Sequence, residues 1–516
     1  MLRSLMRTVP RRAIALAGTA AAAVLLSAGI QPAAAQDKDT LRVAIWSLPF
    51  AKGNPYNGHN RPWIYAWSAM FDGMTIFGED GELQPMLADK WELVNDTTWR
   101  FTLKRGLKFQ NGEEFNADAL VNAVNIVTSD EGKKWQLYGE MRSLQGATKV
   151  DDYTVDVTTS APEPVLPRLF AAMRPVAPKY WADVGSKDFP EKPVGTGPFQ
   201  VTEWTPDRIV MKAHMGGLRK PGTAGMIMTA LPEDAARIPA LLSDQVDIAL
   251  GLNNDAIDEV ERAGHSMSIT QSTGIRVLSL HEEQADSPFR DKRVRLAANL
   301  ALDREALNAA FFGGHAKPMG QPGVPASFGF DASIQPYPYD PERAKQLLAE
   351  AGYPNGFKSV AEIISSGVGG WLLAYPQVAQ DLRKVGIDFE LQQITLADLL
   401  NKLLGQKEWG GDAHDFDIDT LPGMDALRLR TWHSCQNPFP TKWYCNEEAQ
   451  ELIKKAAVET DLGKRADIIH QVMQIYHDDP AGLYLVQEAD FDGINKRVQG
   501  VRIVQRHYFY DEISLK

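Results

Sequence analysis

The stretch that decides the fold runs from Leu83 to Val124 and reads LQPMLADKWELVNDTTWRFTLKRGLKFQNGEEFNADALVNAV. Within it, Trp99, Phe101 and Leu103 alternate with polar residues. This period of two predicts a strand with one apolar face and one wet face. A second short strand is expected at 107–109, after the chain turns at Arg105-Gly106.

A helix is predicted to follow this pair of strands. The dipeptide Asn111-Gly112 is a strong turn signal that ends the second strand. Asn116 is placed to cap the helix because its side chain can accept a hydrogen bond from a free backbone N–H. The predicted apolar face of the helix consists of Leu120, Val121, Val124 and Val127. The physics of this unit alone indicates a compact strand–turn–strand–helix element and no function.

The order of residues in the unit is more specific than its periodicity. The pattern W-x-F-x-L-K-x-G-x-K-F-x-N-G-x-x-F-x-A-D, from residue 99 to 118, resembles the signature of family 5 extracellular solute-binding proteins. Further blocks are similar to this family: PVGTGPF at 193–199, ALLSDQVDI at 240–248, the run at 287–313 and YDPERAKQLLAEAGYPNGF at 339–357. The run AHMGGLRKPGTAG, residues 213–225, departs from the family pattern.

The resemblance implies an α/β fold of two lobes, the large class II periplasmic-binding-protein type, with an extra small subdomain. We expect lobe I at 36–273 plus 494–516, the subdomain at about 80–191, and lobe II at 274–493. Two crossovers between the lobes would permit hinge closure over a solute. The resemblance also implies a monomeric receptor that hands its solute to the inner-membrane permease of an ABC importer and performs no chemistry.

The first 35 residues have the composition of a secretory signal peptide. Four arginines precede an apolar stretch at 13–30, and Ala33-Ala34-Ala35 fits the cleavage rule. The mature chain is expected to start at Gln36, with twin-arginine export as an alternative to the general route. No cysteine lies near the cleavage site, so no lipid anchor is expected there, and the predicted location is the periplasm.

The charge balance argues against nucleic acid as a partner. The formal charge is −12 and the four leader arginines contribute +4 of it, so the mature chain carries −16. Such an acidic chain is repelled by nucleic acid and by anionic lipid.

Other elements follow from local patterns. We expect a buried strand at 40–47, a helix from Trp63 to Phe77, a strand at 150–158, and a hairpin at 201–212. Asp303 and Asp340 are predicted helix caps, and Gly313 and Gly352 are predicted helix stops. In PVGTGPF, the glycines are expected to permit positive φ.

Candidate ligand-binding residues come from loops and aromatic positions. Tyr56 and Asn57 lie in the irregular loop after the first strand, where ligands bind in open α/β sheets. Trp371, Tyr375 and Trp432 suggest stacking against a solute, although core packing explains each of them equally well.

The charged anchors of the dipeptide-binding relatives are harder to place. In those receptors an Asp holds the peptide amine and an Arg holds its carboxylate. Counting back from Cys435 puts the Asp position on Leu421, with Asp419 and Asp425 nearby. Counting back from Gly386 puts the Arg position near Ser365, where no basic residue lies. A zwitterionic dipeptide is therefore not the expected ligand, and a longer peptide, an oligosaccharide or an opine is an alternative.

The two cysteines, Cys435 and Cys445, are expected to form a disulfide in an oxidising compartment. The segment around them resembles a disulfide-bearing loop of the dipeptide-binding relatives. A metal site that adds His433 is the alternative, but it lacks a fourth ligand. No cofactor and no metal are expected.

No catalytic motif stands out. There is no G-x-S-x-G, and the run HEEQA at 281–285 lacks the second histidine of a zinc protease helix. The acidic residues between 412 and 425 do not have the spacing of a Ca²⁺ loop, and a wet loop or a strand beside the hinge is expected there. An exported glycosidase or peptidase stays an alternative, because two carboxylates suffice for glycoside hydrolysis. A metallophore or nickel receptor is a further alternative within the binding proteins.

Overall fold

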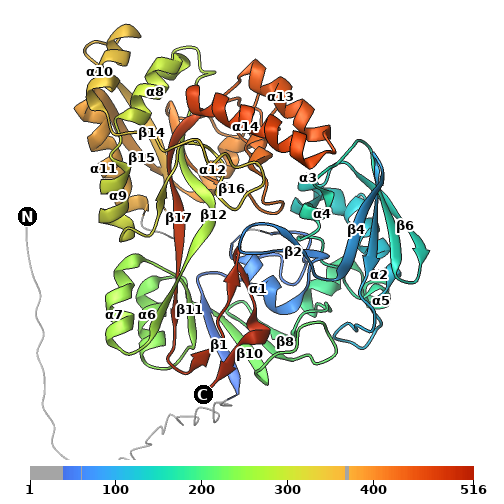
Figure 1. Cartoon of the computed structure of the whole chain (residues 1–516). Coiled ribbons are helices and arrows are strands. Elements are labelled where there is room, and N and C mark those ends of the chain that lie inside the picture. Colours follow the sequence, from blue (N-terminus) through green and yellow to red (C-terminus); the bar gives the residue numbers. More distant parts are fainter. Residues whose placement is uncertain (1–38, 60, 366–370) are drawn as a thin grey trace, which may run out of the picture. The chain divides into compact units, whose positions relative to one another are not determined.

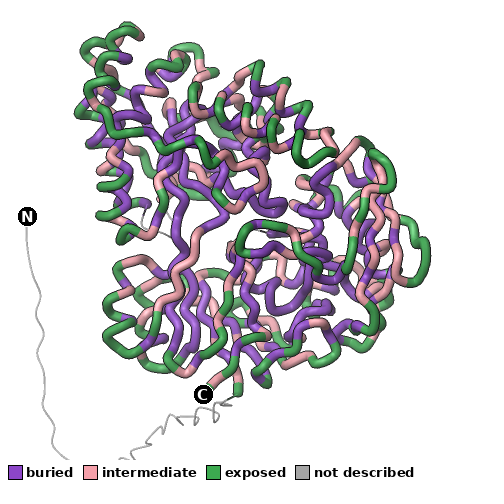
Figure 2. The backbone as a smooth tube through the Cα atoms, in the orientation of Figure 1, coloured by how far each residue is buried: buried purple, intermediate pink, exposed green. Residues whose placement is uncertain are grey.

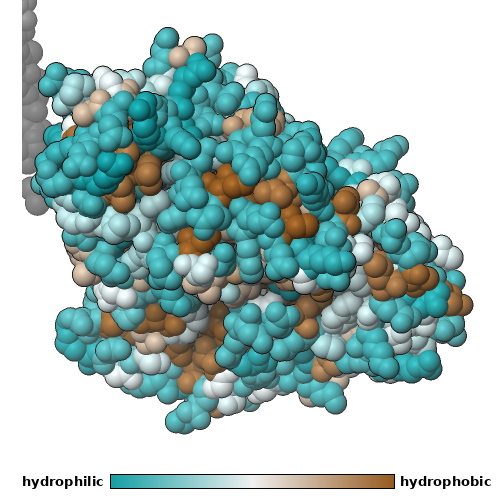
Figure 3. All heavy atoms as spheres, turned by 45° about the horizontal axis from the view of Figure 1, so that its top comes forward, coloured by the Kyte–Doolittle hydropathy of each residue, from teal (hydrophilic) through white to brown (hydrophobic). Residues whose placement is uncertain are grey.

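The computed structural model describes residues 39–59, 61–365 and 371–516. The predicted signal peptide and the expected first mature residue, Gln36, lie outside the described residues. Among the described helices, none has the length and apolarity needed to cross a membrane. Hydrophilic side chains predominate on the face drawn in Figure 3, and apolar ones show there as separate patches.

One mixed sheet of eleven strands organises the described chain. In order across the sheet the strands are β15 (Ile387–Ile394), β14 (Phe357–Ile364), β16 (Ala413–Asp419), β12 (Ser266–Leu280), β17 (Gly482–Ile494), β11 (Ile248–Leu252), β1 (Thr40–Ile45), β10 (Gly225–Ala230), β9 (Arg208–Ala213) and β8 (Phe199–Trp204). The short strand β13 (Lys317–Pro318) pairs with β17. Strand β1 is parallel to β10 and β11, and β14 is parallel to β15 and β16.

Strands β12 and β17 belong to both halves of this sheet. They pair antiparallel over most of their length, from Ser266 opposite Ile494 to Ser279 opposite Gly482. The end of β17 at Ile494 also pairs with β11, whereas β12 pairs with β16 from Gly274 onward. The β12–β17 register shifts between Gln271 and Val277. Figure 1 shows these two strands running from the β1–β11 half to the β14–β16 half.

Helices pack on both halves of this sheet and on a smaller four-stranded sheet. They are α1 (Trp63–Met70), α2 (Ala117–Thr128), α3 (Gln136–Glu140), α4 (Leu166–Leu169), α5 (Pro178–Asp188), α6 (Asp234–Leu242), α7 (Ile257–Arg262), α8 (Lys292–Leu300), α9 (Arg304–Phe312), α10 (Pro341–Glu350), α11 (Trp371–Lys384), α12 (Leu396–Leu403), α13 (Glu447–Val458) and α14 (Leu462–Asp478). In Figure 1, α6 and α7 lie beside β11, and α8 to α11 lie beside β14 and β15. Every residue of β17 is buried, and Figure 2 shows the centre of the sheet buried.

The stretch from Leu83 to Val124 forms part of a separate four-stranded antiparallel sheet. Its strands are β4 (Ala88–Asn95), β5 (Thr98–Leu103), β7 (Thr154–Thr159) and β6 (Leu144–Asp151). Helix α2 packs on β6 and β7. The remaining strands form three two-stranded sheets: β2 (Thr75–Phe77) with β3 (Leu83–Pro85), β18 (Val498–Gln499) with β21 (Ser514–Leu515), and β19 (Ile503–Val504) with β20 (His507–Tyr508).

Several local predictions are confirmed. Strand β5 lies where alternation placed it, and the Asn116 side chain accepts a hydrogen bond from the Asp118 N–H at the start of α2. Asp303 and Asp340 cap α9 and α10 in the same way. Gly313 and Gly352 follow these helices with φ of 59° and 94°, a conformation that favours glycine.

Three expectations about elements are wrong. Residues 107–109 make only an isolated bridge, between Lys108 and Glu114. The helix expected at 63–77 ends at Met70, because the chain becomes extended at Phe71 and returns as β2. The strand expected at 150–158 is the end of β6, a turn and β7, because the Asp152-Tyr153 turn interrupts the alternation.

Glycine occupies positions 195 and 197 of PVGTGPF for a different reason from the predicted positive φ. Neither Gly195 nor Gly197 has positive φ. A Cβ at Gly197 would lie 2.4 Å from the carbonyl carbon of Met70, and one at Gly195 would lie 2.4 Å from the Met70 oxygen. These residues are therefore glycine because the backbone passes directly against the end of α1.

We predict that Gly197→Ala lowers the free energy of unfolding by about 2 kcal/mol or more. The added Cβ would overlap backbone atoms of Met70 and Phe71, so the backbone at Gly197 and at the end of α1 must both move. The matched control is Gly139→Ala in α3, where an added Cβ meets nothing within 4 Å. This control is expected to be neutral or to stabilise by up to about 1 kcal/mol. Urea denaturation of both variants is the measurement, and equal stabilities would contradict the close-packing explanation.

Candidate functional site between the two halves of the sheet

A buried network of charges lies where β12 and β17 pass between the halves. Asp415, Asp417 and Asp419 share one face of β16, because successive side chains of a strand point to opposite faces. Of the two alternatives expected for this segment, residues 413–419 therefore form the strand and not the wet loop. Its position beside a hinge stays a prediction. Strand β17 adds Glu488 and Asp490.

Three arginines from distant parts of the chain neutralise most of these carboxylates. Arg61 contacts Asp490 at 2.5 Å, Glu488 at 3.3 Å and Asp417 at 3.8 Å. Arg276 of β12 contacts Glu488 at 2.8 Å and Asp415 at 3.1 Å. Arg506 contacts Asp419 at 2.6 Å and Asp490 at 3.0 Å. Five carboxylates thus face three guanidinium groups in a buried setting.

The surplus of carboxylates shows in their pKa values. Burial, followed by the neighbouring Glu488 carboxylate, raises the pKa of Asp417 to about 6. Burial also opposes ionisation of Asp419, but Arg506 outweighs it, and the pKa of Asp419 lies below its ordinary value. The network is therefore poised so that an added cation or a proton is accommodated most easily at Asp417.

Two of the predicted aromatic ligand residues join this network. The Tyr375 hydroxyl donates a hydrogen bond to Asp415. The guanidinium of Arg276 lies 5.5 Å from the centre of the Trp371 ring, which also packs on Phe312. Both aromatic side chains are buried, so in this structure they support the charges of β12 and β16.

The structure places the other predicted residues elsewhere. Asp419 lies in the network, whereas Asp425 caps a short 3₁₀ helix, η5 (Ala426–Thr431), and pairs with Arg465 at 2.7 Å. Trp432 stacks on Phe439, with 4.9 Å between ring centres. Tyr56 is fully buried between Trp135 and Trp181, and the half-buried Asn57 belongs to the adjoining turn.

A cavity adjoins the network, and we call it the inner cavity. Both halves contribute to its lining, and its free volume is about 40 Å³. Apolar side chains form most of the wall, and the polar groups include Arg174, His59, His507 and Gln505. Leu421 lines the cavity as well. At the position expected from the dipeptide receptors, the wall is therefore apolar.

Arg174 is a buried cation with few partners. It is 6% exposed, and with the part of the chain that the structure describes its guanidinium makes one hydrogen bond, to the Ala172 carbonyl at 3.2 Å. Among the described residues, no carboxylate forms an ion pair with it. Burial lowers the pKa of Arg174 to about 10, and the charge of the nearby Asp72 carboxylate, which pairs with Arg219, opposes this shift. By contrast, the buried Arg304 donates to three oxygens of Tyr484 and Asn299 at 2.7–2.8 Å.

Direct contacts join the two halves around this cavity. Arg428 of η5 contacts Glu140 of α3 at 2.5 Å, and His59 lies 3.5 Å from the same carboxylate. Burial opposes ionisation of Glu140, but Arg428 and His59 outweigh it and hold the pKa of that carboxyl below its ordinary value. Arg168 of α4 donates to the carbonyls of Gly423 and Met424 at 2.8 and 3.0 Å.

Sequence reasoning missed most of the charged members. Arg61 could have been predicted as a site residue, because it directly follows the loop after the first strand that contains Tyr56 and Asn57. Arg174, Arg428 and Arg506 carried no signal, since each belongs to a segment whose partners lie far away in the chain. Glu140 stood at the end of a short helix without any motif.

Behind β16 lies a second polar cluster, made of neutral histidines. The Nε2 of His281 lies 2.7 Å from Nδ1 of His414, and Gln284 donates to Nδ1 of His281. His433 contacts the Ser279 hydroxyl at 3.0 Å. Burial lowers the pKa values of His281 and His433 to about 3.

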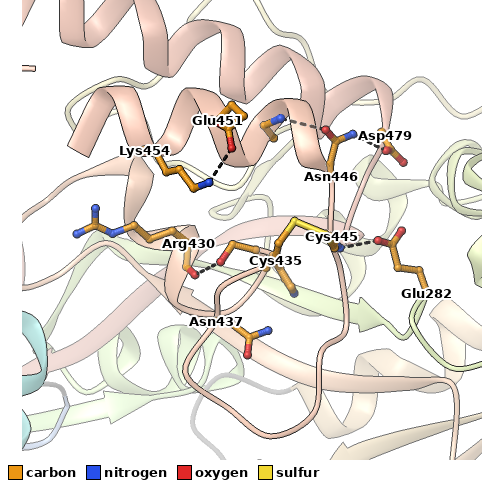
Figure 4. The surroundings of a disulfide bond; sticks show 12 residues. Glu282, Arg430, Cys435, Asn437, Cys445, Asn446, Glu451, Lys454 and Asp479 are labelled. Carbon is orange, nitrogen blue, oxygen red and sulfur yellow. Dashed lines mark hydrogen bonds and ion pairs between the residues drawn. A yellow bond between two sulfur atoms is a disulfide. The ribbon is translucent and has the colours of Figure 1, made fainter. Parts of the chain in front are cut away.

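The predicted disulfide is confirmed. Cys435 and Cys445 are bonded, and among the described residues there is no free cysteine and no cluster of His, Cys, Asp and Glu suited to a metal. Figure 4 shows the crosslink with the Cys445 N–H donating to Glu282 at 2.6 Å.

The fold is a two-lobed α/β architecture built around one large sheet, and comparison with known proteins agrees. The family model "Bacterial extracellular solute-binding proteins, family 5 Middle" matches residues 82–425, more than half of the chain. The chain belongs to this family of solute-binding proteins. Members of the family bind small solutes outside the cytoplasmic membrane and deliver them to ABC permeases.

The relatives are binding proteins and not enzymes. The dipeptide-binding protein of Escherichia coli is 26% identical over 480 residues, which cover 84% of this chain and 86% of that protein. The glutathione-binding protein GsiB of Salmonella choleraesuis is 25% identical, with 90% and 93% covered. Among solved structures, the substrate-binding protein CtaP of Listeria monocytogenes has a TM-score of 0.83 at 20% identity, with 92% and 99% covered. HbpA2 of Haemophilus parasuis has a TM-score of 0.78 at 22% identity, with 92% and 100% covered.

We predict that the histidine cluster makes the fold sensitive to acid. The folded-state pKa of His281 is depressed to about 3, so its contribution to stability is present above pH 6.5 and is lost as the pH falls toward 3. His281→Gln is expected to make the fall in unfolding free energy between pH 6 and 4 shallower, by up to about 1.4 kcal/mol per pH unit. Urea denaturation across this range is the measurement, with His470→Gln as the control; parallel curves for wild type and His281→Gln would refute the prediction.

Proposed function

We propose that this chain is a periplasmic receptor that binds a peptide or peptide-like solute between its two lobes and delivers it to the permease of an ABC importer. The observation that carries the proposal is the pair β12 and β17, which runs through both halves and brings a cavity and charges from both halves together. Two adjacent crossing strands let the halves rotate about a narrow connection.

The lobe boundaries of the proposal follow the pairing of these strands. Lobe I comprises 36–273 and 494–516, with a subdomain at about 80–191, and lobe II comprises 274–493. The first pair between β12 and β16 is Gly274 with Asp419, and the last residue of β17 is Ile494, which supports these limits. Export through the cleaved leader, without a lipid anchor, is part of the same proposal.

The inner cavity favours a solute with a carboxylate. A buried cation without a counter-ion is costly, and the cost is recovered when a ligand supplies the opposite charge. A planar guanidinium binds a carboxylate through two parallel hydrogen bonds. At about 10–15 Å³ for each water-sized site, 40 Å³ holds about three, which suits one acidic group and not a whole peptide. The remainder of the solute would extend along the interface between the lobes.

The test begins with native mass spectrometry of the protein purified from the periplasm, to identify a bound compound. Titration of that compound, and of its carboxamide, is then followed by thermal shift. The acid is expected to raise the melting temperature and to be recovered unchanged. Hydrolysis of the compound would refute the receptor and favour an exported hydrolase.

Arg174→Met is expected to weaken binding of the acid by roughly 1.5–3 kcal/mol, the contribution of a charge-assisted hydrogen bond, and to leave the amide unaffected. The free variant should be at least as stable as wild type, because an unpaired buried charge is removed. Arg304→Met is the matched control and should be destabilised, since three oxygens lose their donor. If Arg174→Met binds the acid as tightly as the wild type does, Arg174 does not bind the carboxylate.

A further inference from the structure

A larger chamber lies outside the inner cavity, and we call it the outer chamber. Its volume is about 350 Å³, within the range of roughly 300–1,000 Å³ that is usual for solute sites. A smaller cavity borders the outer chamber, with which it shares Glu140, Arg430 and Thr431. It is also lined by Thr420 and Gly423, which flank the inner-cavity pair Leu421-Pro422.

Opposite walls of the outer chamber come from the two proposed lobes. Arg142 and Glu163 belong to the subdomain, whereas Arg430, at η5, and Gln450, on α13, belong to the second lobe. A solute in this chamber would therefore contact both proposed lobes, as a solute in the inner cavity would.

The charges of the chamber leave a positive surplus. The side chains of Arg142 and Arg430 form no ion pair or hydrogen bond with any described residue, and both residues are exposed. Glu140 is paired with Arg428, and Lys454 is paired with Glu451 at 2.6 Å. Glu163, which accepts a hydrogen bond from Ser143, is the remaining carboxylate of the described lining. Two guanidinium groups without a salt bridge to a described residue thus face one carboxylate, and the charge of Arg430 already acts on that carboxylate, Glu163.

The disulfide loop gives this chamber a fixed wall. Gln436 and Pro438 line it from the loop that Cys435 and Cys445 close. Inside the loop, Lys442 donates to the Phe439 carbonyl at 2.9 Å. In Figure 4 the Arg430 side chain extends away from the disulfide, and its guanidinium carries no dashed line. The wall is therefore held before any solute arrives, which lowers the entropy cost of binding there.

A buried hydrogen-bond acceptor of the chamber lining, the Gln450 side-chain oxygen, lacks a donor that a ligand would supply. Gln450 is 7% exposed, and its Oε1 has no hydrogen-bond partner among the described residues. Buried polar atoms are normally paired, and Gln450 lines the chamber as a residue, so a ligand donor would satisfy this acceptor once the side-chain amide turns toward the chamber. An amide N–H of a peptide-like solute is a suitable donor.

We propose that the outer chamber is a second solute subsite, in which Arg142 and Arg430 hold an acidic group at the far end of an elongated, peptide-like solute. This assignment rests on the proposed receptor function. The solute would carry one carboxylate at Arg174 and a second acidic group between the two outer arginines. The receptor would then select elongated acids over monocarboxylates of the same length.

The test uses alanine peptides of two to five residues with either an N-succinyl or an N-butyryl group. These two groups have the same chain length and differ by one terminal carboxylate. Isothermal titration of the wild-type protein is expected to show the succinyl peptide binding about 10-fold or more tightly than its butyryl partner. The double variant Arg142→Gln/Arg430→Gln should bind both peptides with the butyryl affinity.

The control variant is Lys292→Gln/Lys358→Gln, which removes the same net charge from exposed positions outside the chamber. It is expected to keep the succinyl preference. Equal affinities in the wild type, a preference that survives in the double variant, or its loss in the control would each overturn the outer subsite.

The same peptides as C-terminal amides separate this proposal from the receptor function. Butyryl peptides that bind better than their amides, with no gain from the succinyl group, would overturn only the outer subsite. Failure of every peptide and amide to bind would overturn the peptide-like receptor and the outer subsite together.

Discussion

The antiparallel pairing of β12 with β17 is the constraint on which the rest of the structure depends. These strands are the common members of both halves of the sheet, so every residue at their crossing is shared between the proposed lobes. Two adjacent strands alone do not fix the orientation of one half of the sheet relative to the other. The contacts that decide how the halves meet therefore come from side chains around the crossing, and most of these side chains are charged.

Burying so many charges is costly unless they are paired. Here each arginine bridges segments that are remote in the chain: Arg506 of the C-terminal segment reaches Asp419 of β16, and Arg428 reaches Glu140 of α3. Such pairs form fully only when the halves are together, so they stabilise one arrangement of the lobes over others. Arg174 differs from the other buried arginines in having little compensation, because its guanidinium forms no ion pair with a described carboxylate and donates only to the Ala172 carbonyl among the described residues, whereas Arg168 and Arg304 each donate to three oxygens. A solute that supplies a carboxylate partner would favour the same arrangement.

Much of the fold was predictable because its signals are local. Alternation at Trp99, Phe101 and Leu103 and the caps at Asn116 and Asp340 act within a few residues, and the structure confirms them. The end of α1 was missed, because apolar residues continue through Phe77 while the backbone already extends at Phe71. The site was largely unpredictable, since ion pairs such as that of Arg61 with Asp490 join residues more than 400 positions apart. Aromatic candidates such as Tyr56 fill the core, and periodicity does not distinguish a buried ring from a binding ring.

The central claim is that the two lobes close over a solute by movement at β12 and β17. Spin labels at Asp152→Cys and Glu342→Cys, both exposed and in different lobes of the proposal, allow the interlobe distance to be measured by pulsed electron resonance. Both native cysteines are in the disulfide, so the labels react at the introduced sites. The account predicts a broad distribution in the solute-free protein that becomes narrower and shifts when the co-purified solute is added. One unchanged, narrow distance with and without solute would contradict it.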